Sequence, residues 1–183
     1  MEESSLQKFW NKRFESFNHT GWKIKSIYDY DQSIRFKAIN KFSVKNSISI
    51  NSGKVFDIGC GTGDFVRLYS LMGANVTGCD LSDDVIAKAK IRFDNFDKVE
   101  VFCSDVEQLE LPKGNFDLIS SITVLMHVVP KEKLINTLNM LNELLSSEGY
   151  LLILESKADG VNKHKDSDDF YINIRSTKDW VDT

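Results

Sequence analysis

The sequence VFDIGCGTG occupies residues 55–63, where a short apolar run leads into three glycines at alternate positions. An amphipathic stretch follows, so the segment predicts a buried strand, a tight turn and the start of a helix. Glycine suits a turn whose backbone takes a positive φ angle or approaches a ligand closely. The helix N-terminus beyond it presents unpaired N–H groups and a positive dipole end. We therefore expect Gly59, Gly61 and Gly63 to border a site for a ligand with an anionic or hydrogen-bonding end.

Short apolar runs alternate with amphipathic stretches from residue 54 onward. Alternation of this kind is typical of βαβ units, whose right-handed crossovers place the loops that follow the strands at one sheet edge. The predicted fold class is α/β, with a Rossmann-like, mostly parallel sheet of about five strands and flanking helices. The expected strands are Val55–Ile58, Asn75–Cys79, Val99–Cys103, Phe116–Ile122 and Tyr150–Leu154. The expected helices are Thr62–Met72, one beginning at Ser82, and Lys131–Ser146 with Gly149 as its stop signal.

Two helices are predicted before the sheet begins. Apolar side chains recur at steps of three and four between Leu6 and Phe17, and residues 18–21 then break the pattern. A second helix is expected from about Ser33 to Val44, with Ile34, Ala38, Ile39 and Phe42 turned inward. The chain is therefore divided into an N-terminal helical segment, residues 1–50, and a sheet-bearing core, residues 51–183.

Length and charge limit the classes of function. A chain of 183 residues is long enough for one domain with a sizeable core. The net charge of -4 argues against a dedicated nucleic-acid binder, although residues 1–50 carry nine basic and five acidic side chains. That basic segment either attracts an anionic substrate or forms a solvated helical face. The first residues lack the apolar core of a signal peptide, and no run has the length of a membrane span, so we expect a cytoplasmic protein.

Cysteine and histidine patterns do not predict a metal site. Cys60, Cys79 and Cys103 have no metal-binding spacing, and each lies at or just past the end of a predicted strand. We expect small buried thiols there, with neither a metal nor a disulfide framework. His19 and His164 lie in polar segments and are interpreted as incidental.

Two acidic residues follow predicted strands at informative distances from the glycine turn. Asp80 lies 21 residues after Gly59. A carboxylate at this position, at the end of the second strand, can accept hydrogen bonds from both hydroxyls of a ribose. Asp105 ends the third strand, where a carboxylate can accept from the exocyclic amine of adenine. The alternatives are a simple loop carboxylate for Asp80 and a helix cap for Asp105.

The spacing of the glycines separates this site from two other nucleotide-binding classes. A dinucleotide fingerprint requires G-x-G-x-x-G, whereas Asp64 follows Gly63 here and puts negative charge where a pyrophosphate would approach. A P-loop is excluded because no Gly-Lys-Ser/Thr sequence follows the turn. The combination of this turn with Asp80 and Asp105 is more specific than the glycines alone.

These motifs, together with VLMHV at residues 124–128, resemble those of the class I S-adenosylmethionine-dependent methyltransferases, over roughly residues 54–155. The resemblance implies that the cofactor is S-adenosyl-L-methionine, with S-adenosyl-L-homocysteine as its product. It places the glycine turn at the methionine part, Asp80 at the ribose and Asp57 in organising the turn. The other implied cofactor contacts are Leu81 beside the adenine, Asp105 and Val106 at the ring, and Ile122 near the amino group, with Gly59, Cys60 and Gly61 making backbone contacts.

A looser likeness covers the first fifty residues, and the family's chemistry also suggests candidates for a catalytic base. In small-molecule methyltransferases of this class, leading helices close over the cofactor and substrate as a lid. This implies that Trp10, Phe14, Tyr30 and Arg35 line the lid, with Arg35 able to meet the cofactor's carboxylate. His127 follows the fourth strand and is the first candidate for the base that a hydroxyl nucleophile requires, or else a packing histidine. Glu155 is a second candidate base, with Tyr30 behind it.

The resemblance ends before the last two strands of the family's sheet, which has seven. Only 29 residues follow Leu154, enough for a loop and one helix, and Ile172–Trp180 is interpreted as the lead-in to that helix. We therefore expect a piece of a longer protein, a partner that completes the sheet, or a shortened fold. The predicted function is methyl transfer to an oxygen or nitrogen of a small molecule, sugar or lipid-linked intermediate. The alternatives are a non-catalytic binding module and an RNA or protein methyltransferase.

Overall fold

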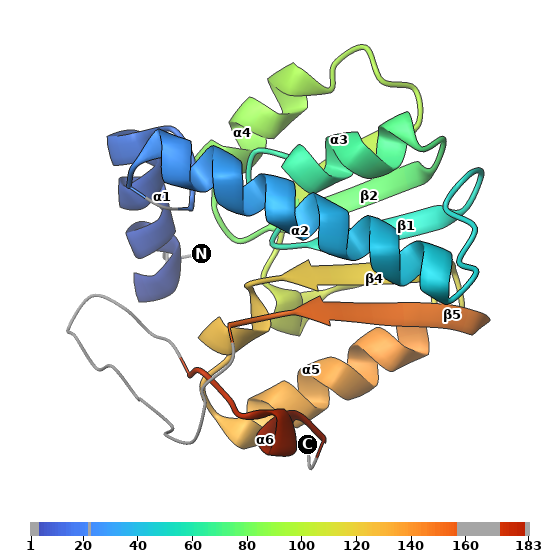
Figure 1. The fold of residues 1–183 in the computed structure, drawn as a ribbon. Coiled ribbons are helices and arrows are strands. Elements are labelled where there is room, and N and C mark those ends of the chain that lie inside the picture. Colours follow the sequence, from blue (N-terminus) through green and yellow to red (C-terminus); the bar gives the residue numbers. More distant parts are fainter. Residues whose placement is uncertain (1–3, 22, 157–172, 182–183) are drawn as a thin grey trace.

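A computed structural model describes residues 4–21, 23–156 and 173–181 of the chain. Five parallel strands form one sheet in the order β3-β2-β1-β4-β5, so the predicted α/β class is confirmed (Figure 1). The strand order reverses between β1 and β4, and open α/β sheets bind ligands at such a point, outside the carboxyl ends of the strands. The strands are β1 Lys54–Ile58, β2 Asn75–Asp80, β3 Val99–Cys103, β4 Phe116–Ile122 and β5 Leu145–Leu154.

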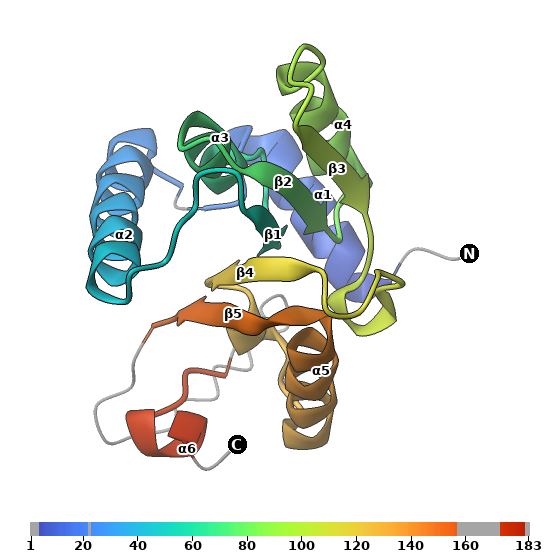
Figure 2. The same cartoon turned by 90° about the vertical axis from the view of Figure 1, so that its right-hand side faces the viewer.

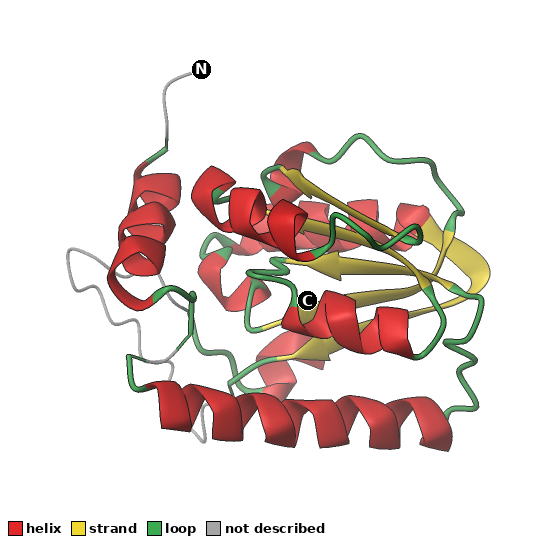
Figure 3. Cartoon of the chain, turned by 90° about the horizontal axis from the view of Figure 1, so that it is seen from above, coloured by secondary structure: helices red, strands yellow, loops and turns green. Residues whose placement is uncertain are grey.

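Helices cover both faces of this sheet, as Figures 2 and 3 show. Alternate strand residues point to opposite faces, so Val55 of β1 packs with helices α2, α3 and α4, whereas Phe56 packs against α5. Buried parallel strands need such cover on both sides, and β1 and β4 are buried at nearly every position. The helices of the core are α3 Asp64–Leu71, α4 Asp83–Arg92 and α5 Lys131–Leu144, with short 3₁₀ turns η1 Val106–Gln108 and η2 Leu125–His127.

The start of α4 confirms the expected cap. Ser82 Oγ accepts a hydrogen bond from the Val85 N–H at 3.2 Å, and Asp83 and Asp84 lie in the first turn, where the helix dipole favours carboxylates. The Ser82 hydroxyl also donates to Asn11 Oδ1 at 2.5 Å, and Asn11 Nδ2 donates to Asp83 Oδ1 at 2.9 Å. One polar cluster therefore caps α4 and fixes the first helix of the chain against it.

Helices α1, Ser5–Phe17, and α2, Lys25–Lys45, precede the sheet. Helix α1 begins at the Ser4 cap and ends where Asn18 takes a left-handed conformation, which agrees with the predicted break. Helix α2 begins about eight residues before its predicted start. The predicted inward face is also partly wrong, because Ile34 is 46% exposed and Ala38 is exposed. Ile39 is buried and Phe42 packs against the core, as predicted. Gln32 and Ser43 are also buried, and these two polar side chains on the inner face obscure the apolar period.

The boundary between α5 and β5 also differs from the sequence prediction. Helix α5 ends at Leu144, and β5 begins at Leu145 rather than Tyr150. Leu145 pairs with Phe116 and Tyr150 with Leu118, so residues 146–149 form an irregularity between two registers. Gly149 is therefore not a helix stop: a Cβ there would lie 2.7 Å from the Phe116 carbonyl oxygen, and glycine permits this close approach of two strands.

The described C-terminal residues return to the carboxyl edge of the sheet. Asn173 N–H donates to the Met126 carbonyl oxygen at 2.8 Å, and helix α6 spans Thr177–Val181. The expected helix is therefore present, but it begins at Thr177, inside the stretch that was interpreted as its lead-in. Ile172 and His164 lie outside the described residues. Within the described ranges, no helix is long and apolar enough to cross a membrane.

Candidate functional site

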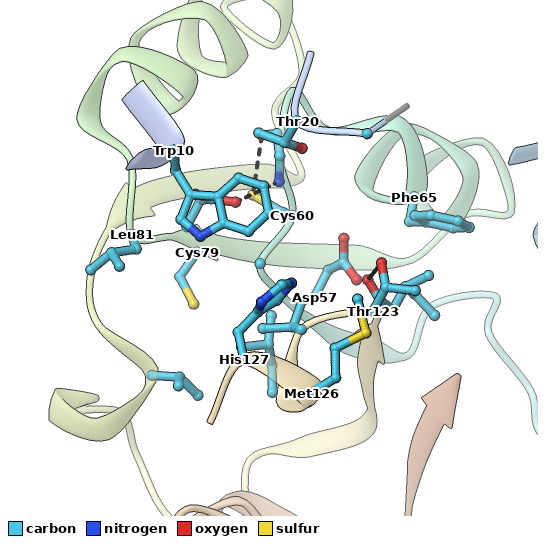
Figure 4. A pocket seen from close by; sticks show the side chains of 18 of the residues that line it. Trp10, Thr20, Asp57, Cys60, Phe65, Cys79, Leu81, Thr123, Met126 and His127 are labelled. Atoms are coloured by element: carbon cyan, nitrogen blue, oxygen red, sulfur yellow. Dashed lines mark hydrogen bonds between the residues drawn. The ribbon is translucent and has the colours of Figure 1, made fainter. Parts of the chain in front are cut away.

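A cavity of about 420 Å³ lies at the carboxyl ends of β1, β2 and β4, beneath α1 and α2 (Figure 4). The cofactor residues expected from the sequence and the first candidate base, His127, all border this one space, whereas the second candidate base, Glu155, and Tyr30 do not. The wall combines three glycine-turn residues with acidic groups from the ends of two further strands and with side chains from both N-terminal helices. These residues are Arg35, Asp57, Gly59, Cys60, Gly61, Asp80, Leu81, Asp105, Val106, Ile122 and His127.

The glycine turn connects β1 to α3 in a conformation that other residues rarely adopt. Gly59 has a φ angle of 60°, and a Cβ there would lie 2.3 Å from a Val124 methyl carbon. Gly63 has a φ angle of 86°, and a Cβ would lie 2.3 Å from the Phe93 ring. Both positions therefore require glycine for backbone conformation and for packing. The turn brings its own backbone to the cavity wall at Gly59, Cys60 and Gly61.

Asp80 links the glycine turn to the loop after β2. Its two carboxylate oxygens accept from the Gly61 N–H at 2.9 Å and from the Ser82 N–H at 3.0 Å. Burial raises the pKa of Asp80, and the backbone N–H groups of Ser82, Gly61 and Leu81 act in the opposite direction. Each oxygen has a second acceptor direction beyond these bonds, and the residue borders the cavity. The Asp80 carboxylate thus stabilises the glycine turn and keeps the capacity to accept a hydrogen bond from a ligand.

Asp105 combines a cavity position with a structural role. Its Oδ1 accepts from the Glu107 N–H at 3.0 Å, and this caps the η1 turn. The helix-cap alternative is therefore present in the structure, although it occupies only one of the two oxygens. Val106 and Leu81 border the cavity beside it, which gives this end an apolar lining with a carboxylate at the rim.

Asp57 is a fully buried carboxylate on the sheet side of the cavity. Its Oδ1 accepts from the Ser120 hydroxyl at 2.6 Å, whereas Oδ2 has no hydrogen-bond partner among the described residues. Burial raises the pKa of Asp57 to about 7, and the Ser120 hydrogen bond opposes this rise. A buried acceptor without a partner is costly, so Oδ2 is a place where a ligand donor would be favourable.

We expect Asp57→Asn to change how stability depends on pH. The folded protein keeps a proton on Asp57 that the unfolded chain releases between pH 3.8 and about 7. The contribution of Asp57 to the free energy of unfolding therefore falls as pH rises through this range. Because asparagine keeps an acceptor for Ser120 but does not ionise, the variant should gain about 1–4 kcal/mol over wild type at pH 8 and less at pH 5. Urea unfolding at both pH values measures this difference, with the exposed Asp84→Asn as the control. If the free energy of unfolding of Asp57→Asn changes with pH as that of wild type does, the prediction is wrong.

Helix α2 faces the cavity with Arg35. Its guanidinium pairs with Asp31 at 2.6 Å and donates to Thr123 Oγ1 at 3.3 Å, at the residue just past β4. Thr123 has a φ angle of 58°, a left-handed conformation that is strained for a β-branched residue and brings its hydroxyl to the cavity. The structure thus places Arg35 at the site, across the junction between the N-terminal helices and the sheet.

Helix α1 reaches the cavity through Trp10. The Trp10 and His127 rings meet edge to face with their centroids 5.1 Å apart, and Figure 4 draws the two side chains against one another. Two other aromatic predictions are wrong as cavity positions. Tyr30 is 68% exposed, and Phe14 packs near the Lys88 ammonium group rather than at the cavity.

A polar network that the sequence did not predict joins α2 to the start of α3. The Tyr28 hydroxyl donates to Asp64 Oδ2 at 2.5 Å, and Gln32 Nε2 donates to the Tyr28 oxygen at 2.9 Å. Arg92 of α4 pairs with the other Asp64 oxygen at 2.8 Å. These bonds lower the pKa of Asp64 despite its burial, so the carboxylate is charged at neutral pH. The 36-residue separation of Tyr28 and Asp64 gave no local sequence signal for this contact.

His19 is also more than an incidental polar residue. Its ring stacks on Tyr28 at 4.3 Å between centroids, and the residue is 8% exposed. Desolvation and the Arg13 charge lower the pKa of His19, which favours the neutral ring. Arg13 donates to the carbonyl oxygens of Thr20 and Gly21 at 2.9 and 2.5 Å and so fixes the connection between α1 and α2.

Glu155, the second candidate base, does not border the cavity. Its Oε1 accepts from the N–H groups of Val124 and Leu125 at 3.0 and 2.8 Å. The titratable residue that reaches the cavity from this turn is His127, beside the apolar Val124, Met126 and Val128. Cys60 and Cys79 are buried, as predicted, but Cys103 is exposed. Burial raises the pKa of both buried thiols, so they are protonated at neutral pH.

A sequence profile of the methyltransferase domain family matches residues 55–149, and the chain belongs to this family. The match covers all five strands in part or whole and the entire glycine turn. The sheet, the turn and the acidic strand ends together define a class I, S-adenosylmethionine-dependent methyltransferase fold.

Curated relatives share this family. The ubiquinone biosynthesis O-methyltransferase of Bradyrhizobium diazoefficiens is 35% identical over 99 residues, which are 52% of this chain and 39% of the relative. The enzyme of the same name from Dechloromonas aromatica is 32% identical over 107 residues, 54% of this chain and 46% of the relative. The chain therefore matches less than half of the length of these relatives.

Solved structures show the same fold. A DhpI–SAM–HEP complex superimposes with a TM-score of 0.70 at 18% identity, over 97% of this chain and 85% of that chain. An S-adenosylmethionine-dependent methyltransferase from Mesorhizobium loti has a TM-score of 0.53 at 28% identity, over 60% and 48%. The [4+2]-cyclase SpnF also superimposes, with a TM-score of 0.65 at 18% identity over 80% and 55%. The fold thus also occurs in a protein named for another reaction, and the activity must be argued from the site.

Proposed function

We propose that this chain transfers a methyl group from S-adenosylmethionine to a hydroxyl oxygen of a small molecule. The observation that carries the proposal is the single cavity with two unlike ends. Asp80 and Asp105 border it where strands finish beside the glycine turn, and His127 and Met126 border it from a separate loop. We assign the first group to the donor end and the second to the acceptor end. Such a cavity has room for a nucleoside-type donor at the first end and an acceptor at the second.

The residues present fit the donor. The backbone of Gly59, Cys60 and Gly61 borders the cavity, Asp80 retains acceptor capacity for a ribose diol, and Asp57 Oδ2 lacks a donor among the described residues. Asp105 would meet the adenine with its second oxygen, between Val106 and Leu81, and Arg35 would meet the carboxylate of the methionine part. Ile122 would lie near the amino group. When bound, S-adenosylmethionine supplies an activated methyl group on a sulfonium.

His127 is the residue that we assign to proton removal. A hydroxyl acceptor must lose its proton as the oxygen attacks, and a positioned imidazole can take it. The edge contact with Trp10 orients the ring, and the turn of η2 brings it to the cavity. The role of the remaining wall is to hold the acceptor in line with the donor, which is itself a large part of catalysis for such a displacement.

The class of acceptor is argued from the lining and from the relatives. Leu6, Trp10, Met126, Val128 and Ile174 border the cavity on the His127 side, which suits an apolar, planar molecule. The curated relatives are named O-methyltransferases of ubiquinone biosynthesis, and this supports oxygen over nitrogen. The cytoplasmic location expected from the sequence stays a prediction.

Two measurements test this function in sequence. Calorimetric titration with S-adenosylhomocysteine should give saturable binding, and its absence would end the proposal. Transfer of labelled methyl from S-adenosylmethionine to a panel of small phenols, with 3,4-dihydroxybenzoate as the first probe, should then give product on oxygen. Binding without transfer to any acceptor, including RNA and protein pools, would favour the non-catalytic alternative; labelling only of RNA or protein would favour the macromolecular one.

We expect His127→Asn to reduce methyl transfer by about 10²–10⁴-fold, the usual contribution of a general base. Binding of S-adenosylhomocysteine should stay within about threefold of wild type, because His127 belongs to the acceptor end. Tyr30→Phe provides the control, since Tyr30 was a candidate from sequence but is exposed. An unchanged rate in His127→Asn would show that the histidine only packs.

A further inference from the structure

The turn that carries His127 is held at its amide end by one carboxylate. Val124 N–H and Leu125 N–H both donate to Glu155 Oε1, from a residue 30 positions later at the end of β5. The second oxygen, Oε2, is buried and has no partner among the described residues. Burial raises the pKa of Glu155 to about 7, against the N–H groups of this turn and the charge of Arg175, which lower it. Oε1 remains an acceptor whether or not Oε2 carries a proton.

The same turn is held at its carbonyl end by one guanidinium. Arg175 is 5% exposed and donates to the carbonyl oxygens of Val128 at 2.7 Å, Val129 at 3.2 Å and Leu125 at 3.3 Å. Its guanidinium also lies over the Trp180 ring at 5.3 Å, and this ring packs with Leu125 and Val128. A buried arginine satisfied by carbonyl groups is expensive to place, so the contact specifies one geometry of the turn.

We propose that Glu155 and Arg175 are positioning residues that clamp the turn of residues 124–129 through its amide and carbonyl groups and so hold His127 at the cavity. The strained Thr123 directly before the turn gives a reason for the clamp, because a free turn would relax away from this conformation. The proposal rests on the proposed function for the chemical role of His127. The placement of its ring is a separate question that does not require an acceptor.

Proton NMR of the His127 imidazole tests the clamp. The Cε1–H resonance of His127 is the one that disappears in His127→Asn. The Trp10→Leu variant gives the chemical shift of this resonance in the absence of the neighbouring indole ring. We expect Glu155→Ala to shift this resonance toward the Trp10→Leu position and to speed exchange of the Val124 and Leu125 amides at least tenfold. Glu155→Gln should restore both signals, because its Oε1 still accepts. Glu148→Ala, an exposed carboxylate in the same strand, is the matched control and should change neither.

Arg175→Lys keeps the charge but loses the fork of donors, so it should shift the resonance partway and provides a second variant if Glu155→Ala does not fold. An unshifted resonance in a folded Glu155→Ala or Arg175→Lys protein would overturn the proposal, as would a Glu155→Gln protein that behaves like the alanine variant.

With 3,4-dihydroxybenzoate as acceptor, clamp variants should lose at least tenfold in kcat. Their affinity for S-adenosylhomocysteine should stay within threefold of wild type. If wild type itself binds no S-adenosylhomocysteine, the proposed function fails while the NMR result still decides the clamp.

Discussion

Asp80→Ala should weaken the binding of S-adenosylhomocysteine by about 100-fold or more, equivalent to about 2.7 kcal/mol. Two losses combine in this variant. The ribose acceptor that we propose disappears, and the Gly61 and Ser82 N–H groups lose their shared carboxylate, which leaves the glycine turn less fixed. Both effects act on the same end of the cavity, so the loss should exceed that of one neutral hydrogen bond.

Calorimetric titration of the folded variant measures this effect. Asp84→Ala removes the same charge from the neighbouring helix α4, where the carboxylate is exposed and away from the cavity, and it should bind as wild type does. If Asp80→Ala binds as tightly as the parent protein, the assignment of the ribose to Asp80 is wrong.

Gly59→Ala should lower the free energy of unfolding by about 2–5 kcal/mol. A left-handed conformation costs a non-glycine residue about 1–2 kcal/mol, and an overpacked site adds about 1–3 kcal/mol. The added Cβ would lie 2.3 Å from Val124 Cγ2 and 3.0 Å from Cγ1, so the Val124 side chain, and with it the turn of His127, must move. Urea unfolding measures the change.

Gly114→Ala separates the two contributions. Gly114 has a φ angle of 66°, close to the 60° of Gly59, but nothing lies within 4 Å of a Cβ built there. This variant should lose only the conformational part, about 1–2 kcal/mol. Equal losses in both variants would show that the contact with Val124 is unimportant and that the turn adapts without cost.

The grouping of the proposed cofactor residues at one sheet edge could be predicted from the sequence, because it follows from the order of strands and the loops after them. Parallel strands end at one edge, so Gly61, Asp80 and Asp105 must lie near one another once β1, β2 and β3 are recognised. The strand runs were clear because each is short, mostly apolar and followed by an amphipathic stretch. The position of each residue directly after its strand was enough to predict that Gly61, Asp80 and Asp105 lie near one another.

The inward face of helix α2 and the contacts of Glu155 and Asp64 could not be predicted from the sequence. Helix α2 exposes Ile27 and Ile34 and buries Gln32, so its apolar period misleads. The role of Glu155 depends on two amides 30 residues away, and that of Asp64 on a tyrosine hydroxyl 36 residues away. Contacts of this kind are set by tertiary packing, and no spacing rule in one sequence encodes them.

The Tyr28–Asp64 bond has a consequence for how affinity would be measured. It ties α2 to the first residue of α3, directly beyond the glycine turn, so any opening of α2 would be coupled to the order of the turn. A ligand that needs both then binds with an intrinsic constant divided by the fraction of molecules that are closed. Tyr28→Phe would reduce that fraction without removing any group proposed to touch the ligand. The apparent dissociation constant would thus depend on the fraction of molecules with α2 closed as well as on the contacts in the cavity.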